Sequence, residues 1–273
     1  NLTENNPGKF TYVKYAVNWP GTGDPYYIPE SYDRALYYGV STAPLVFLDS
    51  EAQVSNQTAQ PVTNSTLMAR YNTPAFADIR GAFNVDGNTI NLSADVMSFI
   101  DLSNVKTYIS INEKTTTGNV GSNGETEFHH VIMKMLDEGE GLDTDITAGE
   151  YKRFEYSFDM SETNVEEMND LEVAVWLQDP ETKEIFNSHF LYEYDEHPYP
   201  AENLHFTQDS RLKISWEAPH DAQPTGYDLY VNNSLMLSNT TQTSFSVDAS
   251  DFCLAEVVAR YGDKTSVSAV KIH

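Results

Sequence analysis

The stretch Thr89-Ile90-Asn91-Leu92-Ser93-Ala94-Asp95-Val96 decides the fold of the middle of this chain. Apolar and polar residues alternate along it, so the apolar side chains from Ile90 to Val96 share one face of an extended segment. Asp86-Gly87-Asn88 directly before it is typical of a hairpin turn. The pattern predicts a β-strand that buries one face and follows a hairpin.

Further stretches between residues 75 and 196 have the same character. They are Val105–Ile111, Glu127–Met135, Tyr151–Phe158, Leu171–Gln178 and Glu184–Leu191. Asp179-Pro180-Glu181 separates the last two as a turn with Pro in its favoured second position. Short strands with alternating faces, joined by turns, predict a β-sandwich over residues 75–196.

The charge of the chain is strongly negative and unevenly spread. The 273 residues carry a net charge of −25, of which residues 75–196 contribute −19 through 26 acidic and 7 basic side chains. Such a surface repels phosphate backbones, which excludes nucleic acid as a partner, and it disfavours an anionic membrane. No apolar run approaches 18 residues, so we expect no transmembrane helix. The simplest interpretation of this charge is a well-solvated surface. The more specific interpretation is that clustered carboxylates bind calcium.

The best candidate for a calcium site is an acidic loop of the middle segment. Its carboxylates, with glycines interspersed, belong to Asp137, Glu138, Glu140, Asp143 and Asp145. Carboxylate oxygens on a flexible loop are the ligands that calcium prefers. The alternative is a solvated loop without an ion. Calcium is the only cofactor that the sequence suggests.

Residues 1–74 mix strand and helix patterns. Phe10–Val17 and Leu45–Leu48 predict buried strands, the second covered on both faces because its apolar run is continuous. Pro29–Tyr38 predicts a helix with Tyr32, Ala35 and Leu36 on its buried face, and Gly39 suits a left-handed cap. A second helix is predicted over Asn64–Tyr71, with Thr63 or Asn64 as its cap.

A loop rich in aromatic residues, Pro and Gly precedes the first of these helices. Trp19, Asp24, Tyr26 and Tyr27 are its candidate binding residues, because aromatic faces beside a carboxylate can hold sugars or peptides. The alternative is that the loop packs onto its own domain.

The run Tyr37–Asp49 resembles the proline loop of thioredoxin-like domains, in which a strand begins after a cis-proline. The resemblance implies a cis bond between Ala43 and Pro44 and a backbone edge that could recognise an extended segment by strand addition. Such a loop normally faces a Cys-x-x-Cys pair, whereas the single cysteine here, Cys253, is most simply a small buried hydrophobe. The segment is therefore similar to part of a thioredoxin-like domain without its chemistry.

Residues 197–273 resemble a fibronectin type III module. Ser215-Trp216-Glu217-Ala218-Pro219 matches the Ser-Trp-x-x-Pro strand of that family, and Gly226–Tyr230 matches its Gly-Tyr-x-x-Tyr strand. Ala255 departs from the family, which often has a tyrosine there. Other strands are predicted at Leu212–Trp216, Gly226–Val231, Ser244–Val247, Ala255–Tyr261 and Thr265–Ile272.

Several spaced motifs over about 190 residues are similar to the twenty-eight-kilodalton outer-membrane-protein family of Gram-negative anaerobes. They are Gly23-Asp24-Pro25, Arg34–Val40 ending at Pro44, His130–Lys134 and Gln178–Glu184. The resemblance implies an exported protein of the periplasm, outer membrane or cell surface, commonly a lipoprotein with a lipid anchor. It implies no established reaction.

The sequence as a whole predicts a mainly β protein with an N-terminal α/β part. Its expected divisions are 1–74, partly thioredoxin-like; 75–196, an acidic β-sandwich; and 197–273, fibronectin type III-like. We expect no enzymatic activity and no catalytic residues, and an action through protein or glycan binding at the cell surface. The main alternative is a thiol–disulfide oxidoreductase or chaperone whose Cys-x-x-Cys lies upstream of Asn1. A glycan-active enzyme with paired carboxylates is a weaker alternative.

Overall fold

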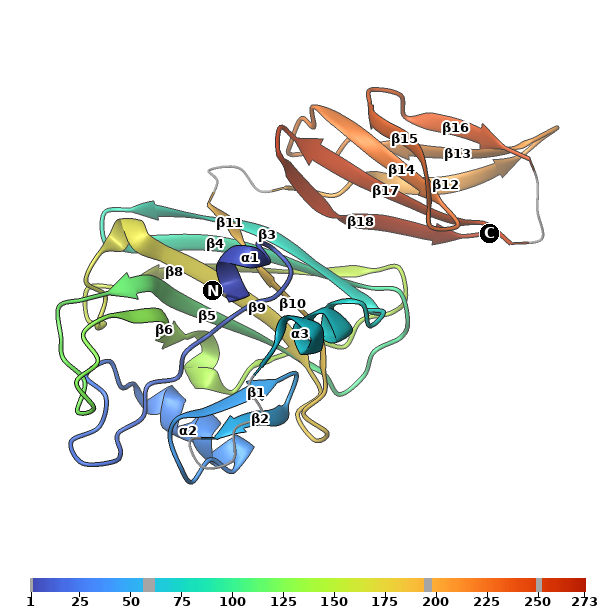
Figure 1. Cartoon of the computed structure of the whole chain (residues 1–273). Helices are drawn as coiled ribbons and strands as arrows, with labels where there is room; N and C mark the ends of the chain where they lie inside the picture. Colours follow the sequence, from blue (N-terminus) through green and yellow to red (C-terminus); the bar gives the residue numbers. More distant parts are fainter. Residues whose placement is uncertain (1, 56–61, 194–197, 249–251) are drawn as a thin grey trace.

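The computed structural model describes residues 2–55, 62–193, 198–248 and 252–273, and it is mainly β, as the sequence predicts. Figure 1 shows two β-sandwiches, with the helices gathered around the first of them and the second joined to it at one end. No helix in the described ranges is long and apolar enough to cross a membrane.

The described residues of the N-terminal part form three helices and one hairpin. Its elements are α1 (Leu2–Asn5), α2 (Pro29–Tyr38), β1 (Leu45–Leu48), β2 (Glu51–Ser55) and α3 (Asn64–Tyr71). Both longer helices have the predicted bounds. Gly39 ends α2 in left-handed backbone at φ 68°, and the Thr63 and Thr66 side chains form a reciprocal capping box on α3.

The first sandwich has two antiparallel-rich sheets. One has the order β10-β9-β5-β6, with β7 beside β5, and the other has the order β11-β3-β4-β8. The strands are β3 (Ala77–Asp86), β4 (Thr89–Ser98), β5 (Lys106–Thr116), β6 (Phe128–Met135), β7 (Leu142–Asp143), β8 (Tyr151–Asp159), β9 (Leu171–Gln178), β10 (Ile185–Phe190) and β11 (Tyr192–Glu193). Short 3₁₀ turns lie at Leu136–Gly139 and Met168–Asp170.

The core of this sandwich lies between the two sheets. The alternation of the opening stretch is confirmed, because Ile90, Leu92, Ala94 and Val96 all belong to the core cluster. Facing them are apolar residues of β5 and β9, such as Ile111. The predicted hairpin is also present, with Gly87 at φ 59° between β3 and β4.

The second sandwich has the strand order of a fibronectin type III module. Its strands are β12 (Glu202–Gln208), β13 (Leu212–Glu217), β14 (Gly226–Val231), β15 (Ser234–Thr240), β16 (Ser244–Val247), β17 (Leu254–Tyr261) and β18 (Lys264–Ile272). They form one sheet ordered β12-β13-β16 and another ordered β15-β14-β17-β18. Trp216 and Leu229 lie in the core between these sheets, and Cys253 is buried there, as predicted for a small hydrophobe.

One strand prediction for the N-terminal part is wrong, and so is the predicted burial of another strand. Phe10–Val17 forms no strand; only Lys14 makes a bridge, parallel to Val131 on β6, the edge strand of its sheet. The segment crosses the outside of the sandwich and pairs at one residue instead of joining β1. Leu45–Leu48 is a strand, but all four residues are only half-buried, because β1 pairs with β2 alone among the described residues.

The predicted buried face of α2 is also wrong. Tyr32 and Leu36 are 40% and 60% exposed. Ala35 is buried as predicted, but the other buried side chains are Glu30, Ser31 and Arg34. A polar face is buried because its partners are polar or aromatic: Glu30 pairs with Lys134, and the guanidinium of Arg34 lies among rings of the sandwich.

Candidate functional site

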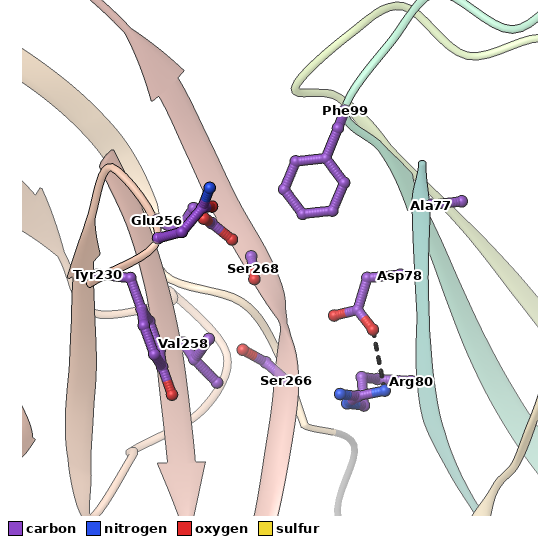
Figure 2. A pocket seen from close by; sticks show the side chains of 10 residues that line it. Ala77, Asp78, Arg80, Phe99, Tyr230, Glu256, Val258, Ser266 and Ser268 are labelled. Carbon is purple, nitrogen blue, oxygen red and sulfur yellow. Dashed lines mark ion pairs between the residues drawn. The ribbon is translucent and has the colours of Figure 1, made fainter. Parts of the chain in front are cut away.

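A cleft of about 350 Å³ opens where the two sandwiches meet. One wall is the start of β3 with Phe99, and the other is the outer face of the β14-β17-β18 sheet (Figure 2). The residues that line it are Ala77, Asp78, Arg80, Phe99, Tyr230, Asn233, Glu256, Val258, Ser266 and Ser268. We refer to it as the junction cleft.

The wall from the first sandwich carries an ion pair. Asp78 and Arg80 alternate with buried Ile79 along β3, so both side chains leave the core and face the second sandwich. An Arg80 Nη1 atom lies 2.9 Å from Asp78 Oδ1. Burial raises the pKa of Asp78 even though Arg80 and the backbone N–H of Ser268 counteract it. The Ser268 backbone of the second sandwich thus faces the Asp78 carboxylate of the first.

The wall from the fibronectin-like module carries an acid beside an aromatic ring. Tyr230 on β14 is directly opposite Glu256 on β17, and Val258 is opposite Ser268 on β18. Their neighbours Leu229 and Val257 are fully buried in the module, so the alternation of each strand directs these side chains outward. Burial, assisted by the charge of Asp78, raises the pKa of Glu256.

Tyr199, in the segment that leads into β12, contacts both sandwiches. The ring of Tyr199 lies 3.9 Å from the guanidinium carbon of Arg153 on β8. The backbone carbonyl of the same residue accepts a hydrogen bond of 2.9 Å from the hydroxyl of Tyr261 on β17. Lys264 of β18 also lies over the ring of Tyr192 on β11, at 4.8 Å. The cleft is therefore a feature of a packed joint.

We expect His189, which lies near this joint, to make the protein less stable in acid. Burial, with the charge of Arg80, lowers the pKa of His189 from 6.5 to about 4. The unfolded chain therefore takes up this proton first, so the stability that neutral His189 contributes is complete above pH 6.5 and is lost as the pH falls toward 4. At pH 4.5 we expect a loss of about 2–3 kcal/mol from this group.

Urea unfolding of the wild type and of His189→Gln at pH 7 and pH 4.5 measures this effect. The variant should lose less stability on acidification than the wild type. His205→Gln, which changes an exposed histidine of the second sandwich, is the matched control. The raised pKa values of Asp78 and Glu256 act in the opposite direction and are common to all three proteins. An equal acid response in His189→Gln and the wild type would contradict the assignment.

The aromatic loop packs largely onto the first sandwich, the alternative that the sequence left open. Tyr26 is buried against Phe128 and donates a hydrogen bond to Glu166, while the Asp24 carboxylate accepts one from the Tyr26 backbone N–H. Trp19 is half-buried and meets the exposed ring of Tyr32 edge-on. Tyr27 is half-buried, and its carbonyl accepts a hydrogen bond from Asn164.

The proline loop lies away from the junction cleft. The Ala43–Pro44 bond is cis, as the resemblance implies, and the Trp19–Pro20 bond is cis as well. Pro44 is exposed and Ala43 is half-buried at the start of β1. Recognition of an extended segment here stays a prediction.

The acidic loop does not gather its carboxylates. All five of its acidic side chains are exposed. Asp143 pairs with Lys106 and Asp145 accepts a backbone hydrogen bond from Asn104, so both are occupied within the protein. In the parts of the chain that the structure describes, no three His, Cys, Asp or Glu side chains lie together as a metal site requires. Calcium binding stays a prediction without geometric support.

No pattern in the sequence indicated the junction cleft. None of its lining residues was a candidate, because Asp78 and Glu256 are 178 positions apart in the chain. The alternation of Asp78-Ile79-Arg80 and of Ala255–Ala259 would have marked the outward positions. Nothing in either pattern indicates that these two faces meet.

Comparison with known proteins shows that the fold of this chain is similar to that of solved structures. No protein-family model matches the sequence, and no curated protein matches it. Among solved structures, the chain is similar to HBP35 of Porphyromonas gingivalis, at a TM-score of 0.50 and 9% identity over 89% of this chain and 80% of that one. A two-domain fibronectin type III segment of chicken tenascin matches at a TM-score of 0.26 and 10% identity, over 72% of this chain and 97% of that one.

The class that these observations define is a mainly β protein of two sandwiches, the second of fibronectin type III-like fold, with a small helical part packed on the first.

Proposed function

We propose that the chain is a non-enzymatic, modular binding protein, exported to the periplasm, outer membrane or cell surface of a Gram-negative bacterium, that binds a protein or glycan partner. The observation that carries the proposal is the junction cleft, whose walls come from two different domains. Ligand sites occur preferentially at domain interfaces, where a few polar groups converge beside aromatic surface. Asp78, Arg80, Glu256 and the rings of Phe99 and Tyr230 supply both here.

The other features of the chain support this function. The acidic surface of the first sandwich keeps the protein soluble and repels polyanions, which favours a protein or a neutral glycan as partner. The motifs that resemble those of the twenty-eight-kilodalton outer-membrane-protein family, and the likeness in fold to a protein of Porphyromonas gingivalis, support the envelope location.

A screen against arrayed glycans and peptides tests the proposal. The wild-type chain should bind members of one of the two classes, and Tyr230→Ala should weaken that binding about tenfold, because an aromatic contact that becomes buried on binding contributes about 1–2 kcal/mol. Tyr71→Ala, which removes a tyrosine that is 52% exposed on α3, is the matched control and should bind as the wild type does. The proposal fails when the wild type binds neither class, or when Tyr230→Ala binds every hit normally.

A further inference from the structure

The charges that line the junction cleft do not balance. Its lining contains two carboxylates, of Asp78 and Glu256, and one cation, Arg80. Arg80 is already committed to Asp78 through the contact of 2.9 Å. Within the described residues no Lys, Arg or His side chain pairs with Glu256, whose charge interacts with that of Asp78 instead. The cleft therefore has one negative charge in excess and room for one cation.

Apolar and aromatic side chains also line the walls next to these acids, beside Asn233, Ser266 and Ser268. Figure 2 shows the ring of Phe99 above Asp78, and the side chain of Ser268 between those of Asp78 and Glu256. Val258 and Tyr230 continue the wall on the side of the module. An aliphatic chain packs well along such side chains, a ring face attracts a cation, and a serine hydroxyl accepts a hydrogen bond from an ammonium group.

From this arrangement we infer that the junction cleft binds an alkylammonium group, namely the lysine side chain of a peptide or protein partner, with its ammonium between Glu256 and Asp78 and its methylene chain along Phe99 and Val258. The inference rests on the proposed function, and it chooses a protein partner over a glycan. Lysine fits better than arginine because a compact ammonium can turn its three donors toward separate acceptors, whereas a planar guanidinium favours one carboxylate in a bidentate pair.

The raised pKa values of Asp78 and Glu256 also favour a cationic ligand in the cleft. Burial raises the pKa of both Asp78 and Glu256, which shows that their charged forms lack full compensation in the free protein. A bound cation supplies that compensation and favours the ionised carboxylates. Affinity for the ligand should therefore fall as the pH is lowered through these raised pKa values.

The test is a titration of the full chain with Nα-acetyl-lysine N-methylamide, followed by the amide resonances of an isotopically labelled sample. We expect a Kd on the order of 1 mM, the range for a ligand of this size, with shifts confined to the lining strands. The Nε-acetylated form of the same compound has no charge and should bind about tenfold more weakly or not at all. Cadaverine, a free diamine, shows whether the peptide backbone adds to binding.

Two variants separate the site from the rest of the surface. Glu256→Gln removes the unpaired charge with little change in shape and should weaken binding about tenfold. Glu217→Gln removes the same charge from an exposed position of β13 that does not line the cleft, and it should have no effect. Phe99→Ala should weaken binding through the loss of the wall, and its amide spectrum shows whether the fold is retained.

Each outcome decides the inference. Preference for the charged compound, lost in Glu256→Gln and kept in Glu217→Gln, supports it. Equal binding of the acetylated compound, normal binding by Glu256→Gln, or shifts outside the cleft overturns it. If arrayed glycans bind the cleft while the lysine compound does not, the inference fails and the proposed function stands. If the lysine compound binds but no arrayed partner does, the proposed function loses its support and the chemistry of the cleft stands.

Discussion

Replacing Arg34 with Ala is expected to weaken the docking of α2 on the first sandwich by about 3 kcal/mol or more. The Arg34 side chain is 3% exposed and donates hydrogen bonds of 2.8 Å to both Gln178 and the Tyr38 hydroxyl. Its guanidinium carbon lies 4.6 Å and 4.4 Å from the ring centroids of Tyr37 and Tyr108. Alanine removes all of these contacts and leaves a cavity among the rings.

Hydrogen exchange of the α2 amides measures this loss without requiring the whole chain to unfold. Exchange should accelerate about 100-fold in α2, while the amides of β17 in the second sandwich keep their rates. Arg34→Lys should fall between the two, because an ammonium keeps the charge but not the planar stacking. Arg211→Ala is the matched control, since its pair with Asp248 is exposed and contributes little. Unchanged exchange of α2 in Arg34→Ala would contradict the expectation.

The role of Arg34 explains what sequence reasoning could and could not predict for α2. The helix bounds followed from Pro29 at the start and Gly39 at the end, both local signals. The buried face depended on the partner surface, which is the outside of the β9 and β5 strands with Trp176 and Tyr108 stacked 5.4 Å apart. Apolar periodicity indicated Tyr32 and Leu36 instead, because it cannot register a cation held among aromatic rings.

The same limit applies to strands and to the site. In the fibronectin-like module the core strands were predicted because buried residues alternate in them, as in β17. Strands β12 and β15 were not predicted, because most of their residues are fully exposed and no apolar face alternates along them. The predicted hairpin implied a strand before Asp86, but no bounds were predicted for β3. Gly81, which weakens its strand pattern, lies where a Cβ would come 2.1 Å from the Ser93 carbonyl oxygen. Since β3 carries Asp78 and Arg80, one wall of the candidate site was missed with it.

The second large effect is expected from Asp95→Ala, which should destabilise the first sandwich by about 3–5 kcal/mol. The Asp95 carboxylate is fully buried and accepts hydrogen bonds from Nε and Nη2 of Arg153, whose own side chain is 14% exposed. Alanine leaves that guanidinium buried without its counter-charge. Thermal and urea unfolding followed by circular dichroism measure the change.

Two further variants test whether the loss of stability in Asp95→Ala comes from leaving the Arg153 charge unpaired. Asp143→Ala is the matched control, because its carboxylate is 93% exposed beside Lys106 and should contribute less than about 1 kcal/mol. The double variant Asp95→Leu with Arg153→Met removes both charges and should be more stable than Asp95→Ala alone. Equal destabilisation by the single and double variants would point to lost packing instead. Arg153 also supports the ring of Tyr199, which contacts both sandwiches. Asp95→Ala and the double variant should therefore loosen this contact and widen the junction cleft, so that a lysine ligand binds more weakly to each of them than to Asp143→Ala.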